Sequence, residues 1–509
     1  MTRTESPHGL PAPSDRASCQ GDLDFNTLPP LYQDRSFWGM TATQFLGAFN
    51  DSVFKQIVLL VCLSVVVVGA SQPSDQQFLA QGVFAIAFIL FSGISGYWSD
   101  RVRKRTLVVG CKVLEVLVML AAAWTFLIMS APKAATKVTV VGELRIENTV
   151  YVTSGMPWPL LAVLFAMGLQ SAIFGPAKYG ILPEMVRGGD LPRFNGMIQM
   201  TTFLALVFGP WVGGLLLDRF HAELWKAGAV CVAIALVGTT SSVFVRRTPV
   251  AQPNAPLRIS ALVAGSETWS LFRKDRSLRL ALFVYSVFWF VAALLPMIIN
   301  WLGVYQFHLN YADTSFLFSV TSIGIAGGFV LAGWLSAERV RFGLVRYGAW
   351  GLILCLLLMS LPASFSTAPA ATPEPPAAAA PGNRGGSDGT ADVSTAPIVK
   401  DAINSSSWHQ LLRLRGSQLV LIFMGFFAGL FALPVQVFLQ SSPPTHLKGR
   451  VIGAMNLINW IAIIFAAVFY FAADSLLGHF ELPKFLTFGL AALFLLPIAL
   501  FYRPSDVEL

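Results

Sequence analysis

Long apolar runs separated by short polar segments dominate the chain from about residue 37 onward. The clearest of these runs are 56–69, 160–175 and 485–501. A run of about 20 apolar residues can cross the roughly 30 Å hydrocarbon core of a bilayer as an α-helix. The alternating ten-residue pattern of membrane β-barrel strands is absent from the sequence. The pattern predicts an all-α polytopic membrane protein with about twelve transmembrane helices, the first at 37–69 and the tenth at 417–440.

Three segments interrupt this pattern. Residues 131–157 alternate between apolar and polar side chains, which predicts a small β-hairpin on the outside. Residues 365–410 are rich in Ala, Pro, Gly and Ser, which predicts a flexible outside linker. The basic segment 246–277 contains an amphipathic stretch around Trp269 and Phe272, which predicts a cytoplasmic connector on the membrane surface.

Two short motifs recur in the second part of the chain. Gly96-Tyr-Trp-Ser-Asp-Arg follows the second apolar run, and Gly333-Trp-Leu-Ser-Ala-Glu-Arg follows the eighth. Arg193-Phe-Asn-Gly-Met-Ile-Gln opens the fifth run, and Arg450-Val-Ile-Gly-Ala-Met-Asn opens the eleventh. Two matches in the same order indicate two related six-helix halves around a central loop, the architecture of the major facilitator superfamily.

The predicted organisation follows from the runs and the repeat. It comprises a cytoplasmic tail at 1–36, a six-helix half at 37–245 with a periplasmic insertion at 131–157, a cytoplasmic connector at 246–277, a second six-helix half at 278–502 with a periplasmic linker at 365–410, and a cytoplasmic tail at 503–509.

Composition and charge agree with this topology. Hydrophobic residues make up 55% of the chain and charged residues only 12%, whereas about 25% of residues in soluble domains are charged. The net charge of +8 arises from Lys and Arg concentrated in the N-terminal tail and the loops predicted to be cytoplasmic. This distribution follows the positive-inside rule, places both termini in the cytoplasm and argues against a nucleic-acid partner.

Catalytic chemistry has little support in the sequence. The first residues lack the pattern of a cleaved signal peptide. The five cysteines are scattered, without the spacing of a metal or redox site. No nucleophile–base pair or phosphate-binding loop stands out. We therefore expect no enzyme activity, no catalytic residues, no metal and no cofactor.

Five ionisable residues fall inside predicted helices of the first half: Asp51, Lys55, Lys112, Glu115 and Lys178. An ionised side chain at the bilayer centre costs about 2.5–3.5 kcal/mol even on insertion scales, so such groups face a cavity or a partner. Asp51 and Lys55 lie four residues apart, and Lys112 and Glu115 lie three apart, so each pair shares one helix face. One interpretation is two intrahelical ion pairs; the other is a site for a head group that carries both phosphate and ammonium.

The second half differs in polarity. Its predicted helices carry almost no interior charge, and their polar atoms come from amide side chains such as Asn300, Gln436 and Asn459. A cavity that is charged on one side and apolar on the other suits an amphiphile better than a sugar.

The segment after the second apolar run matches the loop signature of the major facilitator superfamily. Its members here are Gly96, Asp100, Arg101, Lys104 and Arg105, while Arg103 stands where the signature usually has glycine. A carboxylate and several cations at a helix–loop–helix corner can close the cytoplasmic side through ion pairs and helix dipoles. The second copy lacks the aspartate, with Ala337 or Glu338 nearby, so we do not expect it to form the same lock.

Four segments resemble lysophospholipid transporters of the major facilitator superfamily. The first extends from Gln44 to Lys55 and contains Phe-Asn-Asp-Ser, the second from Phe174 to Glu184, the third from Leu191 to Phe203, and the fourth from Leu433 through Lys448-Gly-Arg-Val-Ile. The resemblance covers about 37–502, nearly all of the predicted membrane part.

The resemblance implies a secondary transporter that moves lysophospholipids toward the cytoplasmic leaflet of the bacterial inner membrane by alternating access. Its partners would be the lysophospholipid, membrane lipids and an acyltransferase/acyl-ACP synthetase. The candidate substrate-binding or coupling residues are Asn50, Asp51, Lys55, Lys112, Glu115 and Gln199. The candidate cytoplasmic gate comprises Gly96, Asp100, Arg101, Lys104, Arg105, Pro176, Lys178, Glu184, Arg339 and Arg450.

Two other functions stay open at this point. One is a permease or efflux pump of the same superfamily for another amphiphile or organic ion. The other is a transport-inactive membrane scaffold that recruits a lipid-remodelling enzyme. Ser52, which stands where close relatives often have asparagine, and the two outside segments separate this chain from the family pattern.

Overall fold

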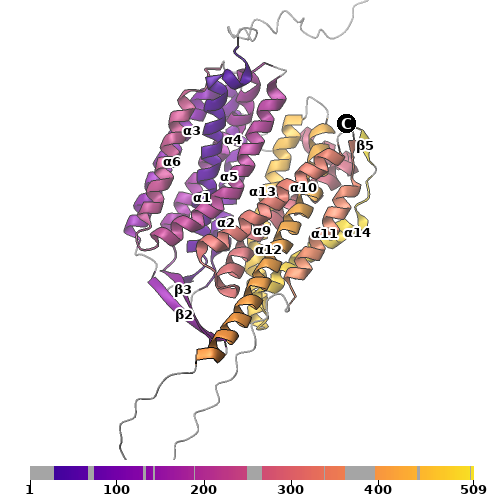
Figure 1. Cartoon of the computed structure of the whole chain (residues 1–509). Coiled ribbons are helices and arrows are strands. Elements are labelled where there is room, and N and C mark those ends of the chain that lie inside the picture. The colour runs from indigo at the N-terminus through magenta and orange to yellow at the C-terminus, as the bar shows by residue number, and fades with distance from the viewer. Residues whose placement is uncertain are drawn as a thin grey trace, which may run out of the picture.

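The computed structural model describes residues 28–66, 74–129, 133–141, 144–187, 190–248, 266–336, 339–361, 396–443, 448–504 and 506–508. Within these ranges two groups of long helices stand side by side (Figure 1). The first group contains α1 Arg35–Val61, α2 Gln77–Arg101, α3 Lys104–Ile128, α4 Trp158–Met185, α5 Leu191–Phe220 and α6 Trp225–Val243. The second contains α9 Arg276–Trp301, α10 Tyr311–Leu335, α11 Gly343–Met359, α12 Ala396–Ser441, α13 Lys448–His479 and α14 Thr487–Phe501.

Most of these helices have the length and composition of membrane spans. Nine helices in the described ranges are long and apolar enough to cross a bilayer, and α2 and α11 contribute shorter apolar stretches, Gln77–Ser92 and Gly343–Met359. The prediction of an all-α polytopic membrane protein is confirmed.

The two ends of the bundle differ. One end, called the terminal face below, is where α1 begins and α14 ends; the other, the hairpin face, carries strands β2 Lys133–Val141 and β3 Leu144–Ser154 (Figure 1). These two strands form the antiparallel hairpin that the alternation at 131–157 predicts. Strand β1, Val65–Val66, extends the sheet by pairing in parallel with β3.

Helix α1 ends earlier than predicted. The apolar run predicts a helix to residue 69, but α1 stops at Val61, and a turn at Cys62–Ser64 leads into β1. The prediction was wrong because hydropathy does not distinguish a helix from a strand. Val65 and Val66 are β-branched, a type that favours strands, and they find hydrogen-bond partners in Ser74 and β3.

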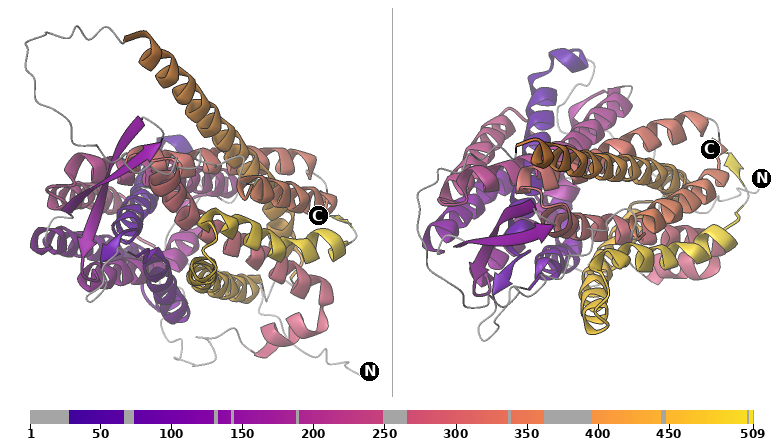
Figure 2. Two further views of the ribbon diagram at one scale, coloured as in Figure 1. Left: turned by 90° about the horizontal axis from the view of Figure 1, so that it is seen from below. Right: turned by 60° about the horizontal axis from the view of Figure 1, so that its bottom comes forward.

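Helix α12 begins earlier than predicted. Residues 365–395 of the expected linker lie outside the described residues, but 396–410 are helical, which corrects the linker prediction for that part. Apolar side chains return there at helical spacing: Val399 and Ile403 are four residues apart, as are Trp408 and Leu412. Figure 2 shows this end of α12 projecting beyond the bundle.

Each group packs mainly within itself, and the groups meet along two helix pairs. Helix α1 packs on α5 and α6, and α10 packs on α12. The α10–α12 contact depends on glycine: a Cβ on Gly328 would collide with the backbone at Phe426, and one on Gly429 with the backbone at Ile325. Such small residues let transmembrane helices approach closely. The contacts between the groups run through α5–α10 and α2–α13.

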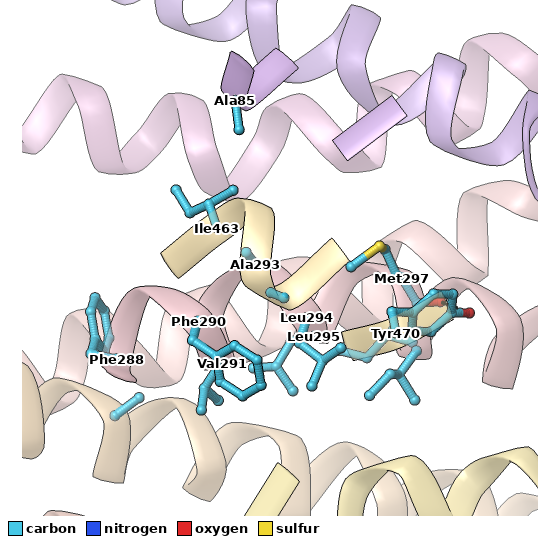
Figure 3. Packing of buried hydrophobic residues seen from close by; sticks show 14 of the residues in the cluster. Ala85, Phe288, Phe290, Val291, Ala293, Leu294, Leu295, Met297, Ile463 and Tyr470 are labelled. Atoms are coloured by element: carbon cyan, nitrogen blue, oxygen red, sulfur yellow. Dashed lines mark hydrogen bonds between the residues drawn. The ribbon is translucent and has the colours of Figure 1, made fainter. Parts of the chain in front are cut away.

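Helix α9 lies at the centre of the second group. Its membrane window, within Arg276–Gln306, is 78% buried, the highest share among the nine candidate spans. Phe290, Leu294 and Met297 of α9 lie among buried residues that include Ile463 of α13 (Figure 3). This apolar core packs α9 tightly against its neighbours.

Short elements complete the terminal face. Helix α8, Ser266–Lys274, lies in the basic connector, where the rings of Trp269 and Phe272 are 6.0 Å apart. Strand β4, Arg339–Val340, pairs antiparallel with β5, Val507–Glu508. The backbone N–H of Phe342 donates to Asp506 Oδ1 at 2.8 Å, which ties the segment after α14 to the start of α11.

Candidate functional site

A fully buried ionic triad lies inside the first helix group. Lys112 Nζ donates to Glu115 Oε2 at 2.6 Å, and Asn50 Nδ2 donates to Glu115 Oε1 at 2.9 Å. Both charged side chains are only 1% exposed. The triad brings together three of the predicted site residues and joins α1 to α3.

Local sequence positions this triad. Lys112 and Glu115 are three residues apart on α3, which places both side chains on one face. Gly47 of α1 leaves the space that the Lys112 ammonium fills, and Gly238 of α6 lies beside the same ammonium, 3.7 Å from a Cβ built there. Glu115 lies eleven residues into α3, about 17 Å from its start. The triad therefore lies near the middle of the span, and small residues enclose it.

Asp51 lies beside the triad but is bonded differently. Ser171 of α4 donates its hydroxyl to Asp51 Oδ2 and also contacts Gln170 Oε1 at 3.0 Å. The second carboxylate oxygen, Oδ1, is buried and has no hydrogen-bond partner among the described residues. Lys112 and Lys178 lie near enough for their charges to act on Asp51. Asp51 therefore has one oxygen available to an external donor.

Lys55 does not pair with Asp51 as the i,i+4 spacing predicts. Its ammonium lies 4.9 Å from the centre of the Phe84 ring on α2, and no salt bridge to Asp51 forms in the described part of the chain. Of the two intrahelical pairs considered from sequence, only Lys112–Glu115 exists. A lysine ammonium can lie over an aromatic ring instead of pairing with a carboxylate, because the face of the ring attracts cations.

Lys178 lies on the terminal-face side of Asp51. Its ammonium is 4.4 Å from the ring centre of Tyr179, and the negative charge of Asp51 acts on it. Pro176, two residues earlier on α4, lacks a backbone N–H and so frees the carbonyl of Ala172 next to Ser171. This part of α4 therefore has a weakened backbone where it meets the charged residues.

The charges divide by role. Lys112 and Glu115 neutralise each other, whereas Asp51, Lys55 and Lys178 form no ion pair within salt-bridge distance among the described residues. The arrangement offers one carboxylate oxygen to a cationic or hydrogen-bonding group and two ammonium groups to an anion. We call Asp51, Lys55 and Lys178, with Ser171, the central cluster.

Pro176 and Lys178 lie nearer Asp51, whereas the other predicted gate residues with described side chains lie at the terminal face. Lys104 at the start of α3 forms an ion pair with Glu184 near the end of α4. Arg105 donates to the backbone carbonyl of Val243 at 2.9 Å, which ties α3 to α6. Gly96 and Arg101 lie in the last turns of α2. The side chains of three further predicted gate residues lie outside the described part: Asp100, Arg339 and Arg450.

Gln199 lies apart from the other candidate substrate-binding residues. It is exposed on α5, and the hydroxyl of Tyr179 donates to its Oε1 at 3.3 Å. Its partner therefore belongs to α4 near the terminal face, and the structure does not join Gln199 to the buried triad.

The Lys104–Glu184 pair gives a first testable prediction. The Lys104 side chain is 9% exposed and the Glu184 side chain 23%, so Glu184→Gln should destabilise the protein. The loss should fall between the ~1 kcal/mol of an exposed pair and the ~3–5 kcal/mol of a fully buried one. Thermal unfolding in detergent measures it. Exchanging the two charges, Lys104→Glu with Glu184→Lys, should recover much of the loss; no recovery would show that the pairing is not the stabilising feature.

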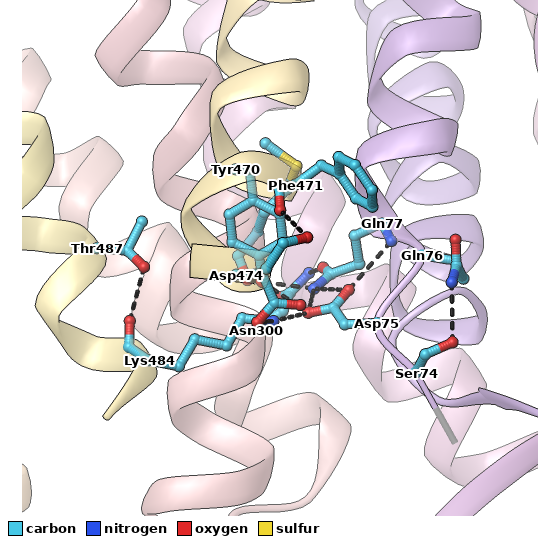
Figure 4. A network of polar contacts seen from close by, with 12 residues as sticks. Ser74, Asp75, Gln76, Gln77, Asn300, Tyr470, Phe471, Asp474, Lys484 and Thr487 are labelled. Atoms are coloured by element: carbon cyan, nitrogen blue, oxygen red, sulfur yellow. Dashed lines mark hydrogen bonds and ion pairs between the residues drawn. The ribbon is translucent and has the colours of Figure 1, made fainter. Parts of the chain in front are cut away.

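A second polar region lies at the hairpin face and joins the two helix groups (Figure 4). Its hub is Asp75, just before α2. Asp75 Oδ2 accepts from the Tyr470 hydroxyl at 2.6 Å and from Lys484 Nζ at 2.9 Å. Lys484 also pairs with Asp474 at 2.9 Å. The first helix group thus supplies a carboxylate to donors in the second group.

A chain of amide side chains continues this network. Gln56 of α1 donates to Asn300 Oδ1 and to Ser315 Oγ, both at 2.9 Å. Asn300 donates to Gln77 Oε1 at 2.9 Å, and Gln77 donates to the carbonyl of Met297 at 3.2 Å. Each bond joins the first group to the second, so the helix groups are held together at this face.

Asp218 makes a further connection on the α5–α10 side. Its carboxylate accepts from the backbone N–H groups of Tyr311 at 3.1 Å and Ala312 at 2.6 Å. These are the first residues of α10, where backbone N–H groups lack intrahelical partners. A carboxylate at that position is also favoured by the helix dipole.

Sequence reasoning missed most of this network. Asp75 falls in a predicted loop and Lys484 at the first residue of a predicted helix, where charges are ordinary, and Asn300 stands out only as a polar residue in an apolar run. Ser171 is a small hydroxyl in an apolar run, which a helix can satisfy with its own carbonyls, so it predicts no site. Gln56 and Gln77 are larger amides inside predicted helices, and their polarity was the available signal.

Comparison with known families gives one broad match. The model described as "Major Facilitator Superfamily" matches residues 40–467. Among curated proteins, the chain is 24% identical over 310 residues to the lysophospholipid transporter LplT of Enterobacter sp. (strain 638), covering 60% of this chain and 68% of that protein. LplT of Klebsiella pneumoniae (strain 342) is 24% identical over 358 residues, covering 68% and 76%.

Solved structures show the same architecture at low identity. A crystal structure of the nucleoside transporter NupG matches with a TM-score of 0.58 and 12% identity, covering 92% of this chain and 98% of that one. A D-xylose–proton symporter matches with a TM-score of 0.55 and 13% identity, with coverage of 92% and 98%. These likenesses concern the fold alone.

Proposed function

The chain belongs to the Major Facilitator Superfamily, and from this premise we propose that it transports lysophospholipids across the membrane toward its cytoplasmic leaflet. The chain is a multi-pass membrane transporter and not an enzyme. The substrate, the direction and the site are the parts that we propose.

The central cluster is the observation that carries the proposal. A lysophospholipid with an ethanolamine head group has a phosphate, a primary ammonium and one acyl chain. The Asp51 oxygen that has no partner can accept from the ammonium, while Lys55 and Lys178 can donate to the phosphate. The cluster thus offers both signs of charge that such a head group requires.

The second helix group offers the complementary surface. Along the described middle of α9 and α10 the side chains are apolar or uncharged. An acyl chain needs apolar surroundings and no hydrogen-bond partner. A charged site in one group, beside a second group that is uncharged along its middle, suits a molecule with one polar end.

The similarity to LplT proteins supports the same substrate class. Two curated LplT relatives match 60% and 68% of this chain. The bacterial relatives also support an inner-membrane location, and the distribution of Lys and Arg supports the terminal face as the cytoplasmic one. On this assignment the network at the hairpin face closes the outside, and the helix groups diverge toward the cytoplasm (Figure 1).

The division into domains is proposed on the same basis. Residues 37–245 and 278–502 would be two six-helix halves that rock about the central cluster, with 246–277 as their connector. An acyltransferase/acyl-ACP synthetase is proposed as the downstream partner, because a delivered lysophospholipid must be reacylated to become a membrane lipid.

A competition experiment tests the substrate class. Purified protein in liposomes should move labelled lysophosphatidylethanolamine, and unlabelled lysophospholipid should compete. Monoacylglycerol, which has the acyl chain without phosphate, should compete poorly. The Lys55→Gln variant should lose about tenfold in apparent affinity, the loss of one charge-assisted hydrogen bond of ~1.4 kcal/mol. Equal competition by monoacylglycerol would refute phosphate recognition.

The same liposomes separate the other candidates. Transport of an unrelated organic ion without lysophospholipid movement would indicate another permease of the superfamily. Specific retention of an acyltransferase by protein that moves no solute would indicate a scaffold.

A further inference from the structure

We propose that two carboxylates of the first group, Asp75 and Asp218, lock the hairpin face reversibly by binding donors of the second group. When the helix groups separate, Lys484 exchanges Asp75 for Asp474. This inference concerns the conformational cycle and holds whichever solute the protein moves.

The two carboxylates lie where the groups meet. The groups contact each other through α2–α13 and α5–α10. Asp75 precedes α2 and reaches Tyr470 of α13, while Asp218 ends α5 and reaches Tyr311 at the start of α10. Each contact line therefore has one carboxylate from the first group that binds donors of the second. Separation of the groups must break both sets of bonds.

Lys484 already has its replacement partner in place. Its ammonium lies 2.9 Å from Asp75 in the first group and 2.9 Å from Asp474 in the second (Figure 4). It also lies 4.7 Å from the ring centre of Tyr470 and 5.8 Å from that of Trp301, both in the second group. A buried ammonium that lost its only carboxylate would be strongly unfavourable. Asp474 removes that penalty when Asp75 departs.

The Tyr470 hydroxyl also keeps a partner of its own, and α10 keeps a second cap. The Tyr470 hydroxyl lies 3.3 Å from the carbonyl of Met297, within its own group. At the start of α10, Asn310 Oδ1 accepts from the N–H of Asp313 at 2.7 Å, so one cap persists without Asp218. The lock therefore joins the groups while Lys484 and Tyr470 keep partners within the second group after opening, and Asn310 continues to cap α10.

This arrangement predicts substitutions of opposite sign. Asp75→Asn removes the ionic bond between the groups and should favour separation. Asp474→Asn removes the replacement partner and should favour the closed face, because Lys484 then has only Asp75. Asp218→Asn should favour separation, since an amide places N–H groups against backbone N–H donors. Asp313→Asn, on the same helix end but within one group, serves as the matched control.

The distance across the hairpin face measures the effect directly. Spin labels are attached at Ala222→Cys and Glu481→Cys, both exposed positions on this face, in a chain whose native cysteines are replaced. Double electron–electron resonance then measures the distance between the labels. We expect the ratio of separated to closed molecules to rise about tenfold for Asp75→Asn and several-fold for Asp218→Asn. It should fall for Asp474→Asn and stay unchanged for Asp313→Asn.

Two results would overturn the proposal. One is a shift in the same direction for Asp75→Asn and Asp474→Asn, which would make Lys484 an ordinary stabilising ion pair. The other is an unchanged distance distribution in Asp75→Asn and Asp218→Asn. Should Asp75→Asn not fold, Lys484→Gln breaks the same bond and is expected to shift the ratio in the same direction. No lipid substrate is added, so the outcome is independent of the proposed function.

Discussion

Replacing Glu115 with alanine is expected to destabilise the protein by about 3–5 kcal/mol, the cost of leaving a buried charge without its partner. Lys112 is 1% exposed and loses its only carboxylate within salt-bridge distance in the described structure. Asn50 loses its acceptor at the same time. Thermal unfolding in detergent and the yield of monodisperse protein after purification measure the loss.

A double substitution separates charge from packing. Lys112→Met with Glu115→Leu removes both charges at similar volume, and buried ion pairs replaced in this way are often neutral or more stable. We expect the double variant to be far more stable than Glu115→Ala. If instead the double variant and Glu115→Ala lose stability equally, then the shape of the side chains rather than charge balance accounts for the effect. Retained transport in the double variant would place the triad outside the substrate path.

Replacing Asp51 with asparagine is expected to lower lysophospholipid transport at least about 100-fold, with little loss of stability. The carboxylate contributes the one oxygen without a partner in the central cluster, and asparagine keeps the shape and the bond from Ser171 but not the charge. Loss of a charge-assisted bond to a desolvated ammonium costs about 3 kcal/mol or more. Initial rates in proteoliposomes, compared at equal protein content, measure the change.

Ser171→Ala is the matched control for Asp51. It removes the hydroxyl that donates to the carboxylate and leaves the negative charge in place, so transport should fall by no more than about tenfold. Wild-type rates in Asp51→Asn would remove Asp51 from the site. Equal losses in the two variants would assign Asp51 a positioning role through Ser171 and not a role in contacting the substrate.

The helical membrane fold was predictable because its physical signal is local. Lipid cannot satisfy backbone polar groups, so each apolar run of sufficient length must form a helix. Exceptions arose where another element offered the backbone a different set of hydrogen bonds, or where a helix extended beyond the apolar run. Val65 and Val66 continue an apolar run yet pair with β3, and residues 396–410 continue a polar linker yet form part of α12.

The candidate site was predictable in part, through the cost of burying charge. Lys112 and Glu115 lie on one helix, so their pairing follows from spacing. The partners of Asp51 and Lys55 lie on other helices, Ser171 on α4 and Phe84 on α2, and helix rotation cannot be read from hydropathy. The hairpin-face network was inaccessible for the same reason, because every one of its bonds between the groups joins residues far apart in the sequence.

The most direct test of the central claim follows labelled lysophosphatidylethanolamine in liposomes that contain the purified wild-type protein. The lipid is added to the outer leaflet, and the fraction that an external extracting protein can no longer remove is measured with time. We expect protection well above that of protein-free liposomes, and a return to their level in Asp51→Asn. Wild-type protein that is folded, correctly oriented and no faster than protein-free liposomes would contradict the central claim.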